Sequence, residues 1–397
     1  MQTLLKEATA IKKYTVDCRR RLHAFAECGF ELPKTLLFVK NELQNLGYKP
    51  EICGKCGLVC ELNAEKGLPL VFLRADMDAL PLKEETALPF RAENGNMHAC
   101  GHDMHTAMLL SAAALLGKRA SDLPVSVRFA FQAAEETLSG ARDMENAGVL
   151  LGVGAAMMIH AVTSVPFQTG TVLLPPSGIA APAACFFEIE VCGKSAHMGE
   201  AHAGEDALEA AFALYRAMRT EAARLGEDLL LSVGKWEAGD APNIVPKHAR
   251  ISGSFRAKDE NKVKAFRERL TALCSQAEAG TQASVRYLGA CPPLKNNSAC
   301  VARLAADLSK TGFSFLAMPP SDGNAAEDFA VFASKRPAVA LALAAGERGR
   351  GYEHPLHHPG VLFDEDALPV GAALYALGAF SLGDGIRLQT FTKGGSV

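Results

Sequence analysis

Residues 97–105 gather several metal-binding side chains in one short segment, Met-His-Ala-Cys-Gly-His-Asp-Met-His, and Glu135 and Glu136 follow 33 and 34 residues after His102. Thiolates, imidazoles and carboxylates bind zinc-like divalent ions, whereas magnesium and calcium require oxygen ligands alone. Adjacent carboxylates point in different directions, so one can bind a metal while its neighbour takes a proton from water. These residue types therefore indicate a metal-dependent hydrolase.

Further imidazoles lie along the chain. His160 follows an apolar run, and His354, His357 and His358 occur within five residues. Together with Cys100 and Glu136, His160 and two other imidazoles could hold two metal ions ~3.5–4 Å apart that share one ligand. A lone histidine after a strand is more often a satisfied core residue. A nucleophilic Cys-His pair is the competing catalytic interpretation, but it leaves Glu136, His160 and His357 without a role.

Two aspartates are candidates for supporting the ligands. Asp103 follows His102 directly and can orient an imidazole, and we assign Asp78 the same supporting role. Gly101 removes a side chain where the loop must turn. Asp103 is also the expected N-cap of a helix over residues 104–116.

Three polar residues occur at strand ends in the middle of the chain: His197, Asn243 and Arg256. They could simply be surface polar groups in loops. As functional residues, His197 and Asn243 would face the metal cleft and polarise a carbonyl or hold a carboxylate, and Arg256 would supply a bidentate clamp.

The elements that must position these residues alternate between helices and short strands. The first 46 residues have helical periodicity that is broken near residues 28–30, and apolar runs then predict buried strands. Such alternation favours an α/β sheet covered on both faces, with ligands bound at the carboxyl ends of the strands. The predicted strands of this sheet are residues 70–73, 125–131, 155–159 and 337–343.

From about residue 182 the pattern changes to βαββαβ, the ferredoxin-like order. We predict a domain of residues 182–292 inserted into a catalytic domain made of residues 1–181 and 293–397. Cys53, Cys56 and Cys60 lie in a predicted hairpin and not in half of a zinc site. The predicted elements of the insertion are strands 184–192, 229–236, 249–255 and 283–288 and helices 205–225 and 261–278.

Composition limits the possible partners. The 397 residues carry a net charge of -3 and have 49% hydrophobic content, which allows a large core but gives no basic stripe for nucleic acid. No stretch is expected to approach the ~18 apolar residues of a membrane span. The N-terminus lacks signal-peptide features, and eleven cysteines at irregular spacing favour reduced thiols, so we expect a cytoplasmic protein with a small-molecule substrate.

From Arg19 to about Leu382 the chain resembles a known family, the dinuclear metallopeptidases and amidohydrolases of peptidase family M20, which includes aminoacylases, hippurate hydrolases and auxin-conjugate amidohydrolases. Several ordered motifs make a chance similarity implausible. They are Arg-Arg-Leu-His (20–23), Gly-Phe-Glu (29–31), Arg-Ala-Asp-Met-Asp-Ala-Leu-Pro (74–81), Met-His-Ala-Cys-Gly-His-Asp (97–103), Phe-Gln-Ala-Ala-Glu-Glu (131–136), Gly-Lys-Ser-Ala-His (193–197), Asn-Ile-Val-Pro (243–246), Glu-Asp-Phe (327–329) and Leu-His (356–357).

The resemblance implies a mixed α/β catalytic domain with an inserted lid, pairing of two chains through that lid, and a site with two metals. It implies Glu135 as general base and Cys100 as the bridging ligand, with His197, Asn243 and Arg256 carried toward the substrate. Whether His197 serves its own chain's site or a partner's stays open. Three positions depart from the family's habit: Ala26, Ala133 and Met198. The implied metal ligands are Cys100, His102, Glu136, His160 and His357.

We therefore predict hydrolysis of the amide bond of N-acyl amino acids by attack of a water molecule held by the metals. The alternatives are a dipeptidase or carboxypeptidase of the same superfamily, which must accommodate a free amino group, and a non-enzymatic metal-dependent binding protein, which has no use for Glu135. Two divalent ions are expected. Zinc or manganese is preferred, and cobalt or nickel could occupy such a mixed site.

Overall fold

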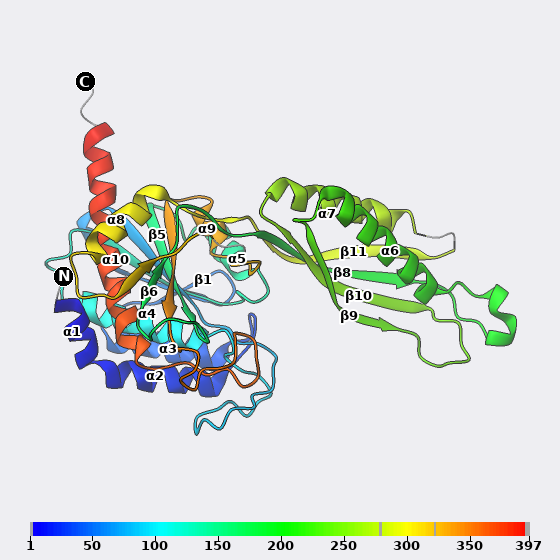
Figure 1. The fold of residues 1–397 in the computed structure, drawn as a ribbon, viewed down its shortest axis with the longest axis horizontal. Helices are drawn as coiled ribbons and strands as arrows, with labels where there is room; N and C mark the ends of the chain where they lie inside the picture. The colour runs from blue at the N-terminus through cyan, green and yellow to red at the C-terminus, as the bar shows by residue number, and fades with distance from the viewer. Residues whose placement is uncertain (1–2, 278–279, 321–322, 394–397) are drawn as a thin grey trace.

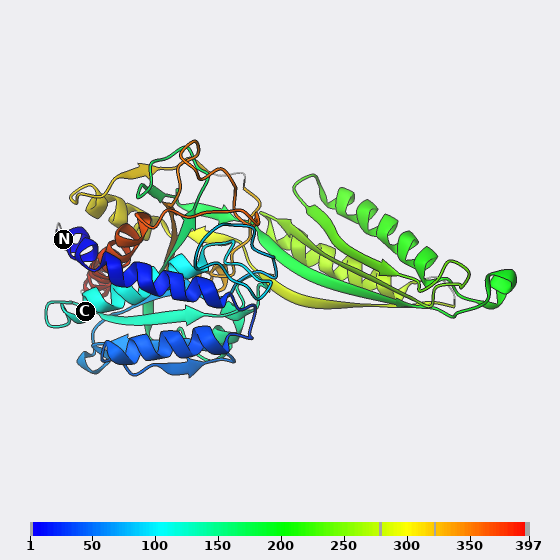
Figure 2. The same ribbon diagram turned by 90° about the horizontal axis from the view of Figure 1, so that it is seen from below.

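The structure is a computed structural model that describes residues 3–277, 280–320 and 323–393. It has two parts (Figures 1 and 2): a body that holds both ends of the described chain, and a long arm formed by residues 183–291. The body is built on an eight-stranded sheet, and the arm on a four-stranded sheet.

The sheet of the body is mixed, as predicted. Strands β3, β4, β5 and β14 run parallel to one another, whereas β1, β2 and β6 join by antiparallel pairing. Every residue of β3 is buried, as expected for a strand covered on both faces. The sheet order is β1 (Glu51–Cys53), β2 (Gly57–Leu62), β4 (Ser126–Gln132), β3 (Leu70–Asp76), β5 (Val153–Val162), β14 (Ala338–Ala344), β6 (Val172–Leu174) and β13 (Phe315–Ala317).

Helices cover both faces of this sheet. The larger core packs against α1 (Thr3–Ala10), α2 (Lys12–Phe25), α3 (Pro33–Asn45), α4 (His102–Gly117), α8 (Ser298–Leu308) and α10 (Ala367–Lys393). The opposite face packs against α5 (Gly140–Asn146) and α9 (Ala330–Ala333). The 3-10 turn η1 (Ala64–Lys66) precedes β3. The predicted α/β fold with helices on both faces is confirmed.

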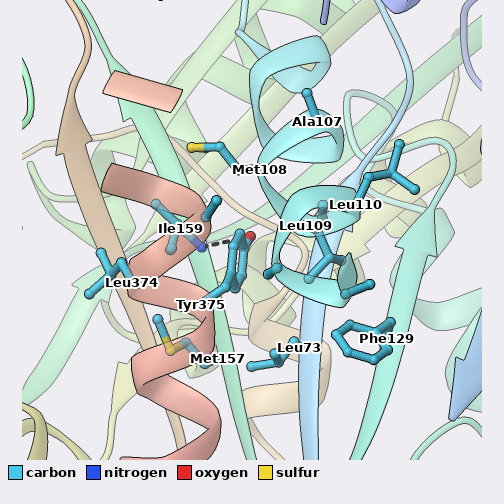
Figure 3. Close-up of a cluster of buried hydrophobic side chains, with 14 of the residues drawn as sticks. Leu73, Ala107, Met108, Leu109, Leu110, Phe129, Met157, Ile159, Leu374 and Tyr375 are labelled. Carbon is cyan, nitrogen blue, oxygen red and sulfur yellow. Dashed lines mark hydrogen bonds between the residues drawn. The ribbon is translucent and has the colours of Figure 1, made fainter. Parts of the chain in front are cut away.

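The hydroxyl of Tyr375 connects α10 to two strands that lead to the site (Figure 3). It donates to the Arg74 carbonyl of β3 at 2.7 Å and accepts from the Ile159 N–H of β5 at 3.2 Å. Tyr375 is fully buried among Leu73, Leu374 and their neighbours. A buried polar group of this kind stabilises the fold only because its partners are present.

Helix α10 contains one segment that the sequence expectation missed. Residues 367–386 are long and apolar enough to cross a membrane by length and composition, and most of this segment is buried inside the protein. The expectation that no such stretch exists is therefore wrong. Burial explains the apolar composition, because a helix surrounded by core is hydrophobic on all sides.

The arm has the predicted βαββαβ order, with strand order β11-β8-β10-β9 and antiparallel pairing throughout. The Asp206 and Asp259 side chains cap its two helices, which pack together on one face of the sheet. The 3-10 segment η2 (Met198–Ala203) joins β8 to the first helix. The elements are β8 (Ala183–Cys192), α6 (Ala207–Leu225), β9 (Leu230–Ala238), β10 (His248–Ala257), α7 (Glu260–Ser275) and β11 (Gln282–Cys291).

The structure differs from the prediction in one helix boundary and in one small additional sheet. Helix α7 ends at Ser275, and the predicted end at Glu278 lies outside the described residues. A small sheet of β7 (Gly178–Ala181) and β12 (Leu294–Asn296), next to β8 and β11 in sequence, was not predicted. The division of the chain into domains at 181/182 and 292/293 stays a prediction.

The predicted hairpin is present, because β1 and β2 pair antiparallel, and Cys53, Cys56 and Cys60 are buried and free.

Helix α4 begins at His102, and its N-cap is Gly101 with a φ of 82°, so the predicted capping role of Asp103 is wrong. Glycine is favoured at this turn because it has no Cβ and adopts a left-handed φ without strain.

Candidate metal centre

Five side chains from four separate segments converge at the carboxyl ends of β3, β4, β5 and β14. Cys100 Sγ lies 3.6 Å from His160 Nε2 and 3.3 Å from His357 Nε2. Glu136 Oε1 lies 3.8 Å from His102 Nε2 and 3.5 Å from His357 Nε2. We call Cys100, His102, Glu136, His160 and His357 the ligand cluster. Their convergence across 257 residues of sequence is what the sequence hypothesis required.

The ligand atoms fall into overlapping groups that could each hold an ion. The atoms of Cys100, His102 and His160 lie within 4.8 Å of one another, and so do those of Cys100, Glu136 and His357. Cys100 belongs to both groups, which suits a thiolate shared by two ions.

Two buried atoms in the ligand cluster fit a metal in particular. His102 Nε2 and Glu136 Oε1 have no hydrogen-bond partner among the described residues. Such orphaned polar atoms are costly unless another group satisfies them. Burial also raises the pKa of the Cys100 thiol, so a cation is needed to hold it as a thiolate. The set of nitrogen, sulfur and oxygen donors therefore fits divalent metal ions.

Asp78 orients the residues around His102. His102 Nδ1 donates to the Asp78 carbonyl at 2.8 Å, which leaves Nε2 facing the cluster. The Asp78 carboxylate lies 3.4 Å from the same Nδ1 and accepts the N–H groups of Glu135 and Glu136 at 3.1 Å each. Asp78 thus positions His102 through its backbone carbonyl, and its carboxylate positions the backbone that carries both glutamates.

Asp103 does not contact His102. Its carboxylate accepts from Arg19 Nε at 2.8 Å and lies 2.9 Å from His23 Nδ1. The expectation that Asp103 orients a ligand imidazole is therefore not met in this structure. Asp103 instead ties the first turn of α4 to α2, because buried charges require paired partners.

His105 was missed in the sequence. Its Nε2 accepts from the Ala161 N–H at 2.7 Å, so its Nδ1 carries the proton and donates to Asp76 Oδ1 at 2.6 Å. Burial lowers the pKa of His105 to about 4, which keeps the ring neutral. The hydrogen bond from the Ala161 N–H to His105 fixes the backbone beside His160. His160 Nδ1 in turn donates to the Ala161 carbonyl at 2.9 Å. The sequence could have indicated His105 as a site residue, because it lies three residues after His102 and therefore on the same face of the helix.

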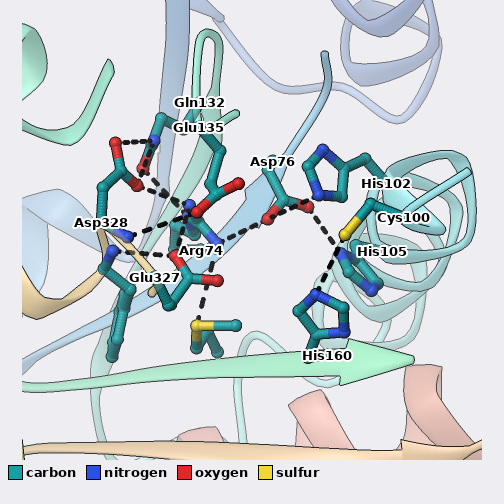
Figure 4. A network of polar contacts seen from close by, with 12 residues as sticks. Arg74, Asp76, Cys100, His102, His105, Gln132, Glu135, His160, Glu327 and Asp328 are labelled. Atoms are coloured by element: carbon teal, nitrogen blue, oxygen red, sulfur yellow. Dashed lines mark hydrogen bonds and ion pairs between the residues drawn. The ribbon is translucent and has the colours of Figure 1, made fainter. Parts of the chain in front are cut away.

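Glu135 lies beside the cluster in a second buried network centred on Arg74 (Figure 4). Arg74 Nη1 donates to Asp76 at 2.7 Å, and its Nη2 lies 3.0 Å from both Glu327 and Asp328. The Asp328 N–H donates to Glu135 Oε1 at 3.3 Å.

Burial raises the pKa of Glu135, and Glu327 and Asp328 raise it further. A carboxylate with a raised pKa is a stronger base, as proton transfer from water requires. Glu327 and Asp328 were recognised only as part of a motif, and their role beside Glu135 was not predicted.

His357 reaches the cluster from a constrained loop. Its φ is 65°, in the left-handed region that non-glycine residues rarely occupy, and its N–H donates to the Ala99 carbonyl at 2.9 Å. Backbone strain of this kind persists where the surrounding structure demands it. The bond joins the loop of His357 to the loop of Cys100.

A cavity of about 690 Å³ opens beside the cluster and is lined by Cys100, Glu135, Glu136, His160 and His357. Arg256 also lines it, as expected.

His197 and Asn243 do not line this cavity. They lie together in the arm, where the Met198 N–H donates to the Asn243 carbonyl at 3.1 Å. The neighbouring η2 is the short green helix at the tip of the arm (Figure 1). The expectation that His197 and Asn243 face the metal cleft is therefore not met within one chain.

Comparisons with known proteins agree with this geometry. Residues 72–379 match the sequence profile of peptidase family M20/M25/M40. An N-acetylcysteine deacetylase from Bacillus subtilis is 30% identical over 371 residues, covering 91% of this chain and 94% of its own. A thermostable carboxypeptidase from Saccharolobus solfataricus is 31% identical, covering 95% of this chain and 97% of its own.

A solved structure has the same fold. A Bacillus subtilis protein described as a dinuclear metal binding peptidase of family M20 superposes with a TM-score of 0.73 at 27% identity, covering 95% of this chain and 99% of its own. The fold and the site thus define a metal-dependent hydrolase. The chain belongs to peptidase family M20/M25/M40.

Proposed function

We propose that the protein is an amidohydrolase that cleaves the amide bond of N-acyl amino acids with two divalent metal ions, zinc or manganese, held by the ligand cluster. Bound there, the ions would acidify water and polarise the acyl carbonyl. The observation that carries the proposal is Glu135, a buried carboxylate next to the cluster whose backbone N–H and side chain are both held in place.

Glu135 acts as the proton carrier in this proposal. It takes a proton from the attacking water and delivers it to the nitrogen of the leaving amino acid, so that the amide C–N bond breaks and a carboxylic acid and an amine form. Cys100, which belongs to both groups of ligand atoms, would help to hold the ions.

The charges around the cavity favour an N-acyl substrate over a dipeptide. Arg256 is the one cationic side chain among the lining residues and can bind the carboxylate of an amino acid. A free ammonium group would need a spare carboxylate. Glu327 lines the cavity, but it already pairs with Arg74 and accepts from the Phe329 N–H at 2.8 Å.

The arm offers a surface through which two chains could pair. Strand β9 is the edge of its sheet, and Leu208, Phe212 and Leu230 are exposed apolar side chains on α6 and β9. A two-fold dimer through the arm would bring His197 and Asn243 toward a partner's cavity. Phe212→Asp should shift the mass measured by light scattering from dimer to monomer, and an unchanged mass would contradict this surface.

The eleven cysteines are free, which supports action in the cytoplasm.

The decisive test is Glu135→Gln. The variant should keep two metal ions per chain by elemental analysis and lose at least about a hundredfold in kcat against an N-acyl amino acid. Glu268→Gln, on the exposed face of α7, is the matched control and should change neither quantity.

Two further results would overturn the proposal: activity that survives exhaustive chelation, or turnover of dipeptides well above that of their N-acylated forms. The second result would favour a dipeptidase or carboxypeptidase, the activity named for the Saccharolobus relative.

A further inference from the structure

The cavity beside the ligand cluster is lined mainly by hydrocarbon. Apart from Glu135 and the cluster residues that line it, the only polar residues among its lining are Arg256 and Glu327. Phe186 is the one lining residue with a carbocyclic aromatic ring, and the rest are aliphatic, methionine or proline residues. An apolar wall stabilises a ligand mainly by removing its hydrocarbon from water.

The floor of the cavity is a row of side chains on one face of three neighbouring strands. Ala342 of β14 pairs with His160 of β5 on one side and with Leu173 of β6 on the other. Ala340 pairs with Met158 in the same way. Neighbouring residues in register share a face of the sheet, so the row leads directly away from His160.

Small side chains hollow this floor. Ala340 and Ala342 are only partly buried, whereas the residues on either side of them in β14 are buried. An alanine ends at its Cβ, so the two positions leave room where a larger residue would reach across the row. The space begins beside His160, where the reacting carbonyl must lie.

We infer that this floor is the acyl-binding surface and that it selects aliphatic acyl chains longer than acetyl. The inference rests on the proposed function, because amide cleavage places the acyl carbon at the cluster. With the amino-acid carboxylate at Arg256, the acyl chain extends from His160 over Ala342, beside Leu173, and along β14 over Ala340. A flat aryl group finds one carbocyclic ring to stack on, that of Phe186.

Kinetics on the metal-loaded enzyme test this preference. One amino acid is used with N-acetyl, N-hexanoyl, N-octanoyl and N-benzoyl groups. Each methylene that enters the cavity should raise kcat/KM about fourfold, so the hexanoyl substrate should exceed the acetyl one on the order of a hundredfold. A flat or falling series would overturn the inference, as would benzoyl above every aliphatic chain.

Variants of the wall locate the surface. Ala340→Leu should lower the ratio of octanoyl to acetyl kcat/KM at least about tenfold. Ile179→Asn replaces a wall side chain that is 38% exposed, so folding is little disturbed and the ratio should fall severalfold. Ala302→Leu, on the exposed side of α8, is the matched control and should keep the ratio. An unchanged ratio in both cavity variants would refute the surface.

Binding separates this inference from the proposed function. The zinc-loaded Glu135→Gln variant is titrated calorimetrically with N-octanoyl and N-acetyl forms of one amino acid. Tighter binding of the octanoyl form supports the acyl surface, even where the wild type fails to hydrolyse either compound and the proposed function fails. Equal binding overturns the acyl surface, even where hydrolysis of both compounds supports the proposed function.

Discussion

Replacing Arg74 by methionine is expected to destabilise the protein by about 3–5 kcal/mol at neutral pH. Arg74 is 1% exposed, and its guanidinium lies within 3.0 Å of Asp76, Glu327 and Asp328. Methionine removes the positive charge, so three buried carboxylates lose the cation that compensates their negative charge. Breaking a buried ion pair costs this much because the remaining charge is uncompensated, and proteins are stable by only about 5–15 kcal/mol.

The loss should depend on pH. Burial raises the pKa of Asp328 to about 7, although Arg74 acts to lower it. A carboxyl with a raised folded pKa opposes folding as the pH rises from about 4, its ordinary value, toward the folded pKa. Without Arg74 this pKa rises further, so the deficit of Arg74→Met should be larger near pH 8 than near pH 5.5.

Urea unfolding followed by far-ultraviolet circular dichroism at the two pH values measures both quantities. Arg119→Met is the control, since Arg119 pairs with Glu7 at the surface, where the side chains are 25% and 42% exposed. Its cost should stay below about 1 kcal/mol. A deficit for Arg74→Met below about 1 kcal/mol, or one equal at both pH values, would refute the argument.

Three further substitutions probe other contacts. Asp78→Ala should weaken metal binding about 10–100-fold in competition with a chromogenic chelator, because the N–H groups of Glu135 and Glu136 lose the carboxylate that holds them in place. Glu365→Gln should lower the free energy of unfolding by about 1–3 kcal/mol at pH 7, and by progressively less as the pH falls below the ordinary pKa of a glutamate. Burial opposes ionisation of Glu365, but bonds from Arg20 and Arg19 outweigh it and lower its pKa, so the stabilisation disappears as the pH falls. Tyr375→Phe should cost about 1–3 kcal/mol in thermal or urea unfolding, because two buried backbone groups lose their partner.

Each of these has a matched comparison. Asp122→Ala, at an exposed position, should leave metal affinity unchanged, and an equal loss there would contradict the role of Asp78. A deficit of Glu365→Gln that does not decrease as the pH falls below the ordinary pKa of a glutamate would exclude its ion pairs as the cause. Tyr48→Phe removes a single bond, to the Ala113 carbonyl at 2.8 Å, and should cost less than Tyr375→Phe.

Much of the fold followed from local patterns. The strands at residues 70–73 and 125–131 and the βαββαβ order of the arm were predicted because hydrophobic periodicity is a property of neighbouring residues. Boundaries were less accurate: β5 continues past His160 to Val162, and α4 begins at His102. Element ends depend on capping and on tertiary contacts, which a periodicity does not contain.

The site was predictable as chemistry but not as a set of contacts. Cys100 and His102 stood out because their types and spacing suit a metal. The sequence could not rank Asp78 against Asp103. Asp103 follows His102 directly and Asp78 precedes it by 24 residues, yet folding places Asp78 against His102 and Asp103 against His23. The sequence indicated His105 as a site residue less clearly than it indicated Cys100 and His102.

The amino-acid sequence by itself determined the order of helices and strands and the kinds of ligand that the cluster contains, because both depend on residue type and short spacing. Only the tertiary structure decided which charges meet: Arg74 and Asp328 are 254 residues apart, yet their side chains are 3.0 Å apart. It also decided that residues 367–386 are core and that His197 lies in the arm, away from the cavity of its own chain. Such contacts arise from packing distant segments together, and no local pattern encodes that packing.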